Sequence, residues 1–104
     1  MKIYTTDTIE GETIEKSLGL VQGAVVQSKH IGRDIMAGLK TIVGGEIAGY
    51  TEMLQNARSI ATKRMIEDAQ KIGADAIVGV RFGSSSLMAG SAEIIVYGTA
   101  VKLK

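Results

Sequence analysis

A glycine-flanked segment in the middle of the chain carries the residues whose chemistry is easiest to name. Gly44, Gly45 and Glu46 stand where the pattern of a long helix begins, and backbone amides at a helix N-terminus can hold an anion. We therefore take these three residues, with Arg81 from a later strand, as candidate contacts for a small ligand or ion. The segment lacks the spacing of a P-loop or a dinucleotide fingerprint, and Glu46 would repel a phosphate. A tight turn that lets subunits pack closely is the favoured interpretation of the two glycines.

Few side chains in this sequence can act as metal ligands. The chain has no cysteine and a single histidine, His30, so thiolate and multi-histidine sites within one chain are excluded. His30 is a candidate metal ligand, although a surface residue is the favoured interpretation, and it would need symmetry-related copies around an axis to complete a site; oxygen ligands are the alternative. Four acidic residues near the N-terminus do not have the spacing of a calcium loop, so a solvated face is the favoured interpretation of Asp7, Glu10, Glu12 and Glu15.

No arrangement of residues predicts catalysis. No serine stands in a nucleophile motif, and none of the three tyrosines has an evident base partner. An enzyme could still form if a site were assembled between subunits, with Glu46, Arg58 or Arg81 as its polar groups. No catalytic residue and no cofactor are therefore assigned.

Composition narrows the class of protein. The 104 residues make one domain, 1–104, and they hold 12 basic and 11 acidic side chains, giving a formal net charge of +1. That balance and an aromatic content of 4% argue against a nucleic-acid partner. No stretch is long and apolar enough to span a membrane, and no apolar run follows Lys2, so we expect a cytoplasmic protein without a membrane partner.

One long helix must position these residues. Apolar residues recur at spacings of three and four from Glu46 to Ile72, which predicts a helix about 40 Å long with one buried stripe. Gly49 is the weak point of its first turn, and the helix could begin after it. Gly73 is well placed to end it in a left-handed conformation. The stripe comprises Ile47, Tyr50, Leu54, Ala57, Ala61, Met65, Ala69 and Ile72.

The remaining segments predict strands. Thr13–Lys29 is rich in β-formers, with Gly19 and Gly23 as bulges or bends, and Ile3–Thr5 adds a short edge strand. After the helix, the chain alternates from residue 76 to residue 83, turns at 88–91 and continues as a strand from Ala92 to Leu103. We place Ala76, Val78, Val80 and Phe82 on one face of the first of these two strands. The result is an α+β fold of order β-β-α-β-β with an antiparallel sheet.

The last strand is apolar on both faces. Ile94, Val96 and Ala100 lie on one face, and Ile95, Tyr97 and Val101 on the other. An antiparallel sheet with one solvated face would alternate apolar and polar residues instead, and a single helix covers only one face. The second apolar face then has no partner within the chain, and we expect it to be buried against another copy. A monomer with an exposed apolar sheet is the alternative.

Several runs of this chain resemble the YbjQ-like family: IVGGE at 42–46, Tyr50-Thr51, Arg58 and Arg64, GADAIVGVRF at 73–82 and YGTAV at 97–101. The resemblance extends over nearly the whole chain. It implies a curved antiparallel sheet with one long helix, assembled into a homo-oligomeric ring of five subunits. The family is commonly labelled a "putative heavy-metal-binding" domain, and the resemblance carries over no ligand or catalytic residue.

Three functions follow as hypotheses. The first is a non-enzymatic ring that binds itself, and a small ligand or ion, at its subunit junctions. The second is a metal-binding protein, as the family label suggests, although soft metals prefer thiolate and imidazole ligands that are scarce here. The third is an enzyme with a site between subunits.

Overall fold

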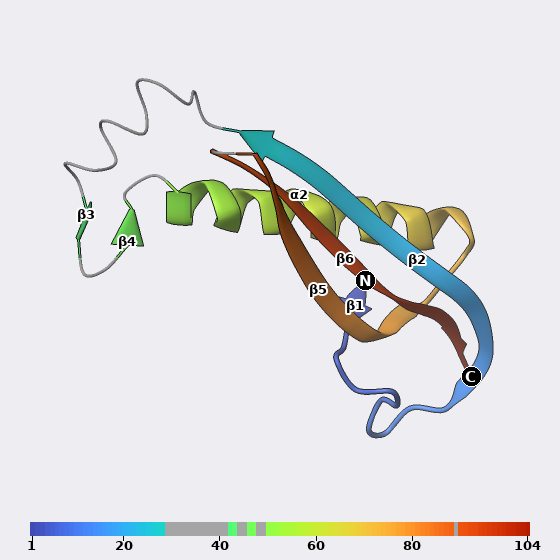
Figure 1. The fold of residues 1–104 in the computed structure, drawn as a ribbon. Coiled ribbons are helices and arrows are strands. Elements are labelled where there is room, and N and C mark those ends of the chain that lie inside the picture. Colours follow the sequence, from blue (N-terminus) through green and yellow to red (C-terminus); the bar gives the residue numbers. More distant parts are fainter. Residues whose placement is uncertain (29–41, 44–45, 48–49, 89) are drawn as a thin grey trace.

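The computed structural model describes residues 1–28, 42–43, 46–47, 50–88 and 90–104 (Figure 1). Its elements are β1 (Lys2–Ile3), β2 (Ile14–Ser28), β3 (Ile42–Val43), β4 (Glu46–Ile47), α2 (Tyr50–Lys71), β5 (Ala76–Met88) and β6 (Ser91–Leu103). Four strands form one open sheet in the order β1-β5-β6-β2, while β3 and β4 form a separate two-stranded sheet. The predicted α+β class, with one long helix and a β5–β6 hairpin, is confirmed. The predicted order β-β-α-β-β is corrected, because the short strands β3 and β4 also precede the helix.

The sheet is mixed, which corrects the prediction of a purely antiparallel one. β6 pairs antiparallel with both β2 and β5, but β1 runs parallel to β5, with Lys2 opposite Ala76 and Ile3 opposite Ile77. The N-terminal segment continues along this edge through three backbone hydrogen bonds, ending with the amide of Gly79 donating to the carbonyl of Thr6. Short edge strands of this kind leave little periodic signal in a sequence.

Helix α2 ends at Lys71, one residue before the predicted Ile72, and begins after Gly49, the later of the two predicted starts. Gly73 has a φ of +77°, and the Ala74 amide donates to the Ala69 carbonyl, which is the hydrogen bond of a Schellman ending. The first helical residue is Tyr50, because Glu46 and Ile47 belong to β4 and pair with Val43 and Ile42. The helix is therefore 22 residues, or about 33 Å, long.

The core lies between α2 and the face of the sheet toward it, which we call the helix-facing side. The stripe of α2 buries Ala57, Ala61, Met65 and Ala69. Small residues on the helix and Gly23 on β2 let the two backbones approach closely: a Cβ atom at Gly23 would lie 2.0 Å from the Ala61 carbonyl oxygen. Of the bulges or bends predicted at Gly19 and Gly23, Gly19 does lie at a register shift, whereas Gly23 lies at none and is a packing residue.

A bulge in β5 changes which residues share a face. The pairing with β6 shifts between Val78 and Arg81, where Gly79 has a φ of +62°. As a result Ile77 and Val80 point into the core, while Ala76 and Val78 belong to a second cluster on the opposite, outer side of the sheet. Our grouping of Ala76 and Val78 with Val80 was wrong because an unbroken alternation cannot anticipate the extra residue of a bulge.

Candidate functional site

The outer side of the sheet is covered at one end by the N-terminal segment. Ile9 is buried there against Ala76, Val78 and Val101, with Tyr4 packed alongside. The expectation that this face has no partner within the chain is therefore wrong for the half of β6 nearest the C-terminus. The segment fills that half because its path from β1 to β2 crosses the outer side.

The other half of the outer side is uncovered. Leu20 is 68% exposed, Val26 56% and Tyr97 42%, although all three are large apolar residues on long strands. The pairing of β2 with β6 places Leu20 opposite Thr99, Ala24 opposite Ile95 and Val26 opposite Glu93, all on the outer side. We call the apolar members the outer patch: Leu20, Ala24, Val26, Ile95 and Tyr97. An apolar group of this kind on a sheet face is typical of an interaction surface.

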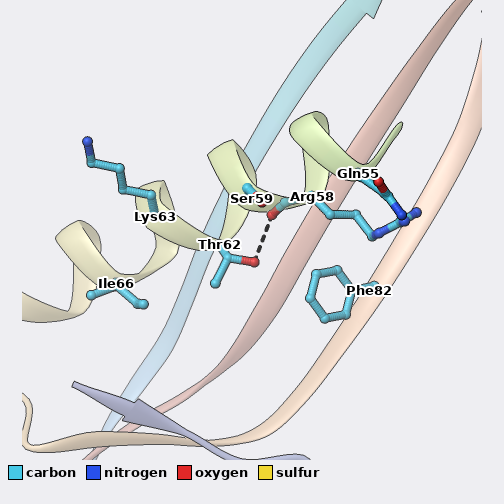
Figure 2. Close-up of a pocket in the computed structure, with 7 residues that line it drawn as sticks. All are labelled: Gln55, Arg58, Ser59, Thr62, Lys63, Ile66 and Phe82. Carbon is cyan, nitrogen blue, oxygen red and sulfur yellow. Dashed lines mark hydrogen bonds between the residues drawn. The ribbon is translucent and has the colours of Figure 1, made fainter. Parts of the chain in front are cut away.

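A groove lies on the helix-facing side, between α2 and β5. It has a volume of about 700 Å³ and is open to solvent along its length. The helix packs on β2 and β6 and barely reaches β5, so Phe82 is left 50% exposed beside it. Figure 2 shows Phe82 facing the helix across this space. We call it the α2–β5 groove; its lining residues are Gln55, Arg58, Ser59, Thr62, Lys63, Ile66 and Phe82.

The charged side chains of the α2–β5 groove are both basic. Arg58 extends from the helix toward the side of the groove where Phe82 lies, whereas Lys63 points away from that ring to the rim (Figure 2). The hydroxyl of Thr62 donates to the Arg58 carbonyl, 2.8 Å away, and so is engaged within the helix. In the described part of the chain the one ion pair joins Lys102 and Asp75, so neither groove cation is paired with a carboxylate. The groove can therefore attract a negatively charged partner.

The two edges of the sheet differ in how they are protected. Side chains of α2 occupy the edge of β2: the Gln22 amide donates to Asp68 at 3.3 Å, and Arg64 donates to the Ala24 carbonyl at 2.7 Å. The edge of β5 is bonded to the N-terminal segment only as far as Val80, whose amide donates to the Tyr4 carbonyl. No backbone hydrogen bond between described residues continues this pairing beyond that point. Among the described residues, the part of β5 beside the groove is therefore an unpaired strand edge, the kind of edge at which another chain can pair.

Arg81 holds the N-terminal segment in place. Its guanidinium donates through Nη1 to the Thr5 carbonyl at 2.8 Å and to the Val80 carbonyl at 2.8 Å. The predicted ligand contact is thus engaged by its own backbone on the outer side of the sheet. Arg58 lies on the other side, so one chain does not bring these two arginines together.

The remaining predicted contacts are only partly visible. Glu46 forms β4 with Ile47, at the N-terminal end of α2 (Figure 1). Gly44, Gly45 and His30 lie outside the described residues. The ligand contacts at Gly44, Gly45 and Glu46 and the candidate metal ligand His30 therefore stay predictions.

The described residues do not fit a heavy-metal site. They contain no group of three or more histidine, cysteine, aspartate or glutamate side chains placed to hold an ion. Soft metals also prefer thiolate ligands, which the sequence lacks altogether. Nothing in the described part of the structure therefore supports a chemical step through a metal.

Phe82 is the residue of the groove that sequence reasoning missed. The alternation placed it correctly on the same face as Val80, and an apolar residue on that face is expected to be core. Its exposure follows from how far α2 reaches across the sheet, which no local sequence pattern indicates.

Among the described residues, no helix combines the length and the apolar character needed to cross a bilayer.

Comparisons with known proteins place the chain among close relatives. A family model described as YbjQ, "Putative heavy-metal-binding", matches residues 1–104. A UPF0145 protein from Colwellia psychrerythraea is 64% identical over 96% of this chain and 95% of its own length. A UPF0145 protein from Methanosarcina acetivorans is 57% identical over 99% of this chain and 97% of its own length.

A solved structure shares the fold. The crystal structure of a protein of unknown function from Pediococcus pentosaceus, assigned to the DUF74 family, matches with a TM-score of 0.73. The match covers 100% of this chain and 98% of the other, at 17% sequence identity. With a family model matching every residue and relatives this similar over nearly their full length, the chain belongs to the YbjQ family, as its sequence runs indicated.

Proposed function

We propose that this protein is a non-enzymatic subunit of a homo-oligomeric ring of five copies, and that its binding surfaces, including any for a small ligand or ion, lie at the subunit junctions. The observation that carries this proposal is the outer patch. Three large apolar side chains of a small domain, Leu20, Val26 and Tyr97, are each more than two-fifths exposed on one sheet face. Burying them against another copy removes that apolar surface from water.

The rest of the described structure supports a binding role over catalysis. Of the groups that an enzyme between subunits would use, Arg81 is engaged by the Thr5 carbonyl of its own chain, where it fastens the N-terminal segment. The α2–β5 groove is open in one chain, and a neighbour lying over it would turn it into an enclosed junction. Pockets that hold small molecules bury most of the ligand surface, so a junction is a better site than the open groove.

The experiment measures subunit number before and after the outer patch is made polar. Light scattering coupled to gel filtration should give the unmodified protein a mass of about 55 kDa, five times the 11.0 kDa of one chain. Leu20→Asn with Tyr97→Asn should lower the mass toward one chain and leave the melting temperature of the separated subunit nearly unchanged, because exposed sites contribute little to stability.

Ile72→Asn is the matched control. Ile72 is 48% exposed and apolar, like Leu20 and Tyr97, but it lies at the end of α2, outside the outer patch. This variant should keep the mass of the unmodified protein. An unmodified protein of 11.0 kDa, or a double variant that assembles as the unmodified protein does, would contradict the proposal.

A further inference from the structure

We propose that neighbouring subunits pack front to back, with the α2–β5 groove of one copy receiving the outer side of the next, and with Arg58 and Lys63 facing its acidic N-terminal segment. This inference rests on the proposed function and identifies the two surfaces that meet at a junction. The occupant of the groove is thus a second copy of this chain.

The shape of the groove favours a macromolecular occupant. A small-molecule site encloses most of its ligand, whereas the α2–β5 groove is open to solvent along its length. A smaller hollow of about 150 Å³, also lined by Arg58 and Phe82, continues it to Gly83, Ser84 and Ile94. The combined surface follows the edge of β5 that the N-terminal segment leaves unpaired. A protein surface can cover such an extended, open depression, and its apolar side chains can pack on Phe82 and Ile66.

The outer side offers apolar groups to match Phe82 and Ile66. The outer patch supplies Leu20, Val26 and Tyr97 as exposed side chains on a sheet face. Because the groove and the outer patch lie on opposite sides of the same sheet, both can be used at once by different neighbours. Contacts between two different surfaces of identical subunits are heterologous, and they close into a ring when the rotation between copies allows it.

Charge complementarity points to the N-terminal segment as the part that faces the groove cations. Asp7, Glu10 and Glu12 are exposed there, and none of them forms an ion pair with a described residue. The segment lies on the outer side because Ile9 packs against Val78 and Val101.

The same segment has space for a long basic side chain. A hollow of about 580 Å³ lies on this segment, and Glu10 contributes a carboxylate to its lining. The lining residues are Tyr4, Thr6, Thr8, Ile9 and Glu10. Among the residues that the structure describes, the groove cations lack carboxylate partners and the acidic segment lacks cationic ones. Front-to-back packing supplies both sets with partners.

The experiment reverses the charges in one chain and then restores complementarity. Arg58→Glu with Lys63→Glu puts like charges at every junction, and Glu10→Lys with Glu12→Lys does the same from the other side. Each reversed charge should raise the subunit dissociation constant about tenfold, so each of these two double variants should raise it about a hundredfold. The fourfold variant that combines all these substitutions has opposite charges again at each junction, and its formal net charge stays at +1 because the changes cancel. It should assemble like the unmodified protein.

Lys71→Glu is the matched control, since Lys71 is an exposed lysine of the same helix that lies outside the groove. It should leave the dissociation constant within about twofold, as expected for a charge outside the contact. Circular dichroism checks that each variant is folded. The inference is overturned if folded double variants assemble as the unmodified protein does, or if the folded fourfold variant stays dissociated. An unmodified protein that is monomeric would instead overturn the proposed function, and the inference with it.

A second measurement applies even if the fourfold variant does not fold. Raising the salt concentration from about 0.1 M to about 1 M shortens the Debye length from about 10 Å to about 3 Å and so weakens attraction between the paired surfaces. The dissociation constant of the unmodified protein should rise over this range. An unchanged or lower value would mean that apolar contacts alone join the subunits, which would overturn the charge pairing.

Discussion

The two sides of the sheet are built from neighbouring residues of the same strands, yet they are covered in different ways. On the helix-facing side, Val96 and Ala100 are completely buried beneath α2. On the outer side, the N-terminal segment buries Val101 but stops before Ile95 and Tyr97. The comparison shows that apolar alternation indicates which residues are suited to burial. The length of the covering element decides which of them are buried within one chain.

The largest difference between the sides should come from placing a charge on each. Val96 is fully buried, so Val96→Asp should cost at least about 4 kcal/mol, close to the lower end of the ~5–15 kcal/mol that stabilises a small domain. The protein should be unfolded by circular dichroism. Ile95→Asp, one residue along on the outer side, should fold and lose assembly only. A stable, assembled Val96→Asp protein would show that the helix-facing side is not the core.

Replacing a glycine by alanine on each side of the sheet should give a smaller difference in the free energy of unfolding. The Cβ of Gly23→Ala would lie 2.0 Å from the Ala61 carbonyl oxygen and 2.6 Å from the Met65 amide nitrogen, so α2 must move away from β2. Chemical denaturation should show a loss of about 3 kcal/mol.

Gly83→Ala is the matched control on the outer side. Its Cβ would meet only the Ile95 Cγ2 at 3.3 Å, and a small side-chain adjustment can absorb that contact. The change in the free energy of unfolding should be within about 0.5 kcal/mol. Equal losses at Gly23 and Gly83 would contradict the close approach of α2 to β2.

The smallest effect tests how the N-terminal segment is attached. Arg81→Met removes the hydrogen bond to the Thr5 carbonyl and should cost about 1 kcal/mol. Hydrogen exchange should accelerate at the amides that this segment bonds to, those of Gly79 and Val80, while the amides of α2 keep their protection. If protection at Gly79 and Val80 is unchanged, the arginine does not fasten the segment.

Much of the fold was predictable because its signals are local. The apolar spacing on α2, the helix ending at Gly73 and the turn between β5 and β6 depend on residues close in sequence. The ending and the turn are confirmed, and the stripe is confirmed from Ala57 to Ala69, whereas Ile72 is 48% exposed. The errors are of another kind. The bulge at Gly79 and the packing of Ile9 on Val101 depend on contacts between distant residues, and a single sequence carries no periodic trace of them.

The candidate site was harder to predict for the same reason. Arg81 has the chemistry of a ligand contact, and only its distance to the Thr5 carbonyl shows that it fastens the chain to itself. Phe82 has the pattern of a core residue and is half-exposed because α2 does not cover β5. In both cases residue type was informative, and the position of a distant element decided the role.

Sedimentation equilibrium of the unmodified protein at micromolar concentration tests most directly whether the uncovered surfaces are shared between copies. We predict a single species of about 55 kDa, five times the mass of the 11.0 kDa chain. A particle of 11.0 kDa would show that Leu20, Val26, Phe82 and Tyr97 stay in contact with water, and the ring would be contradicted.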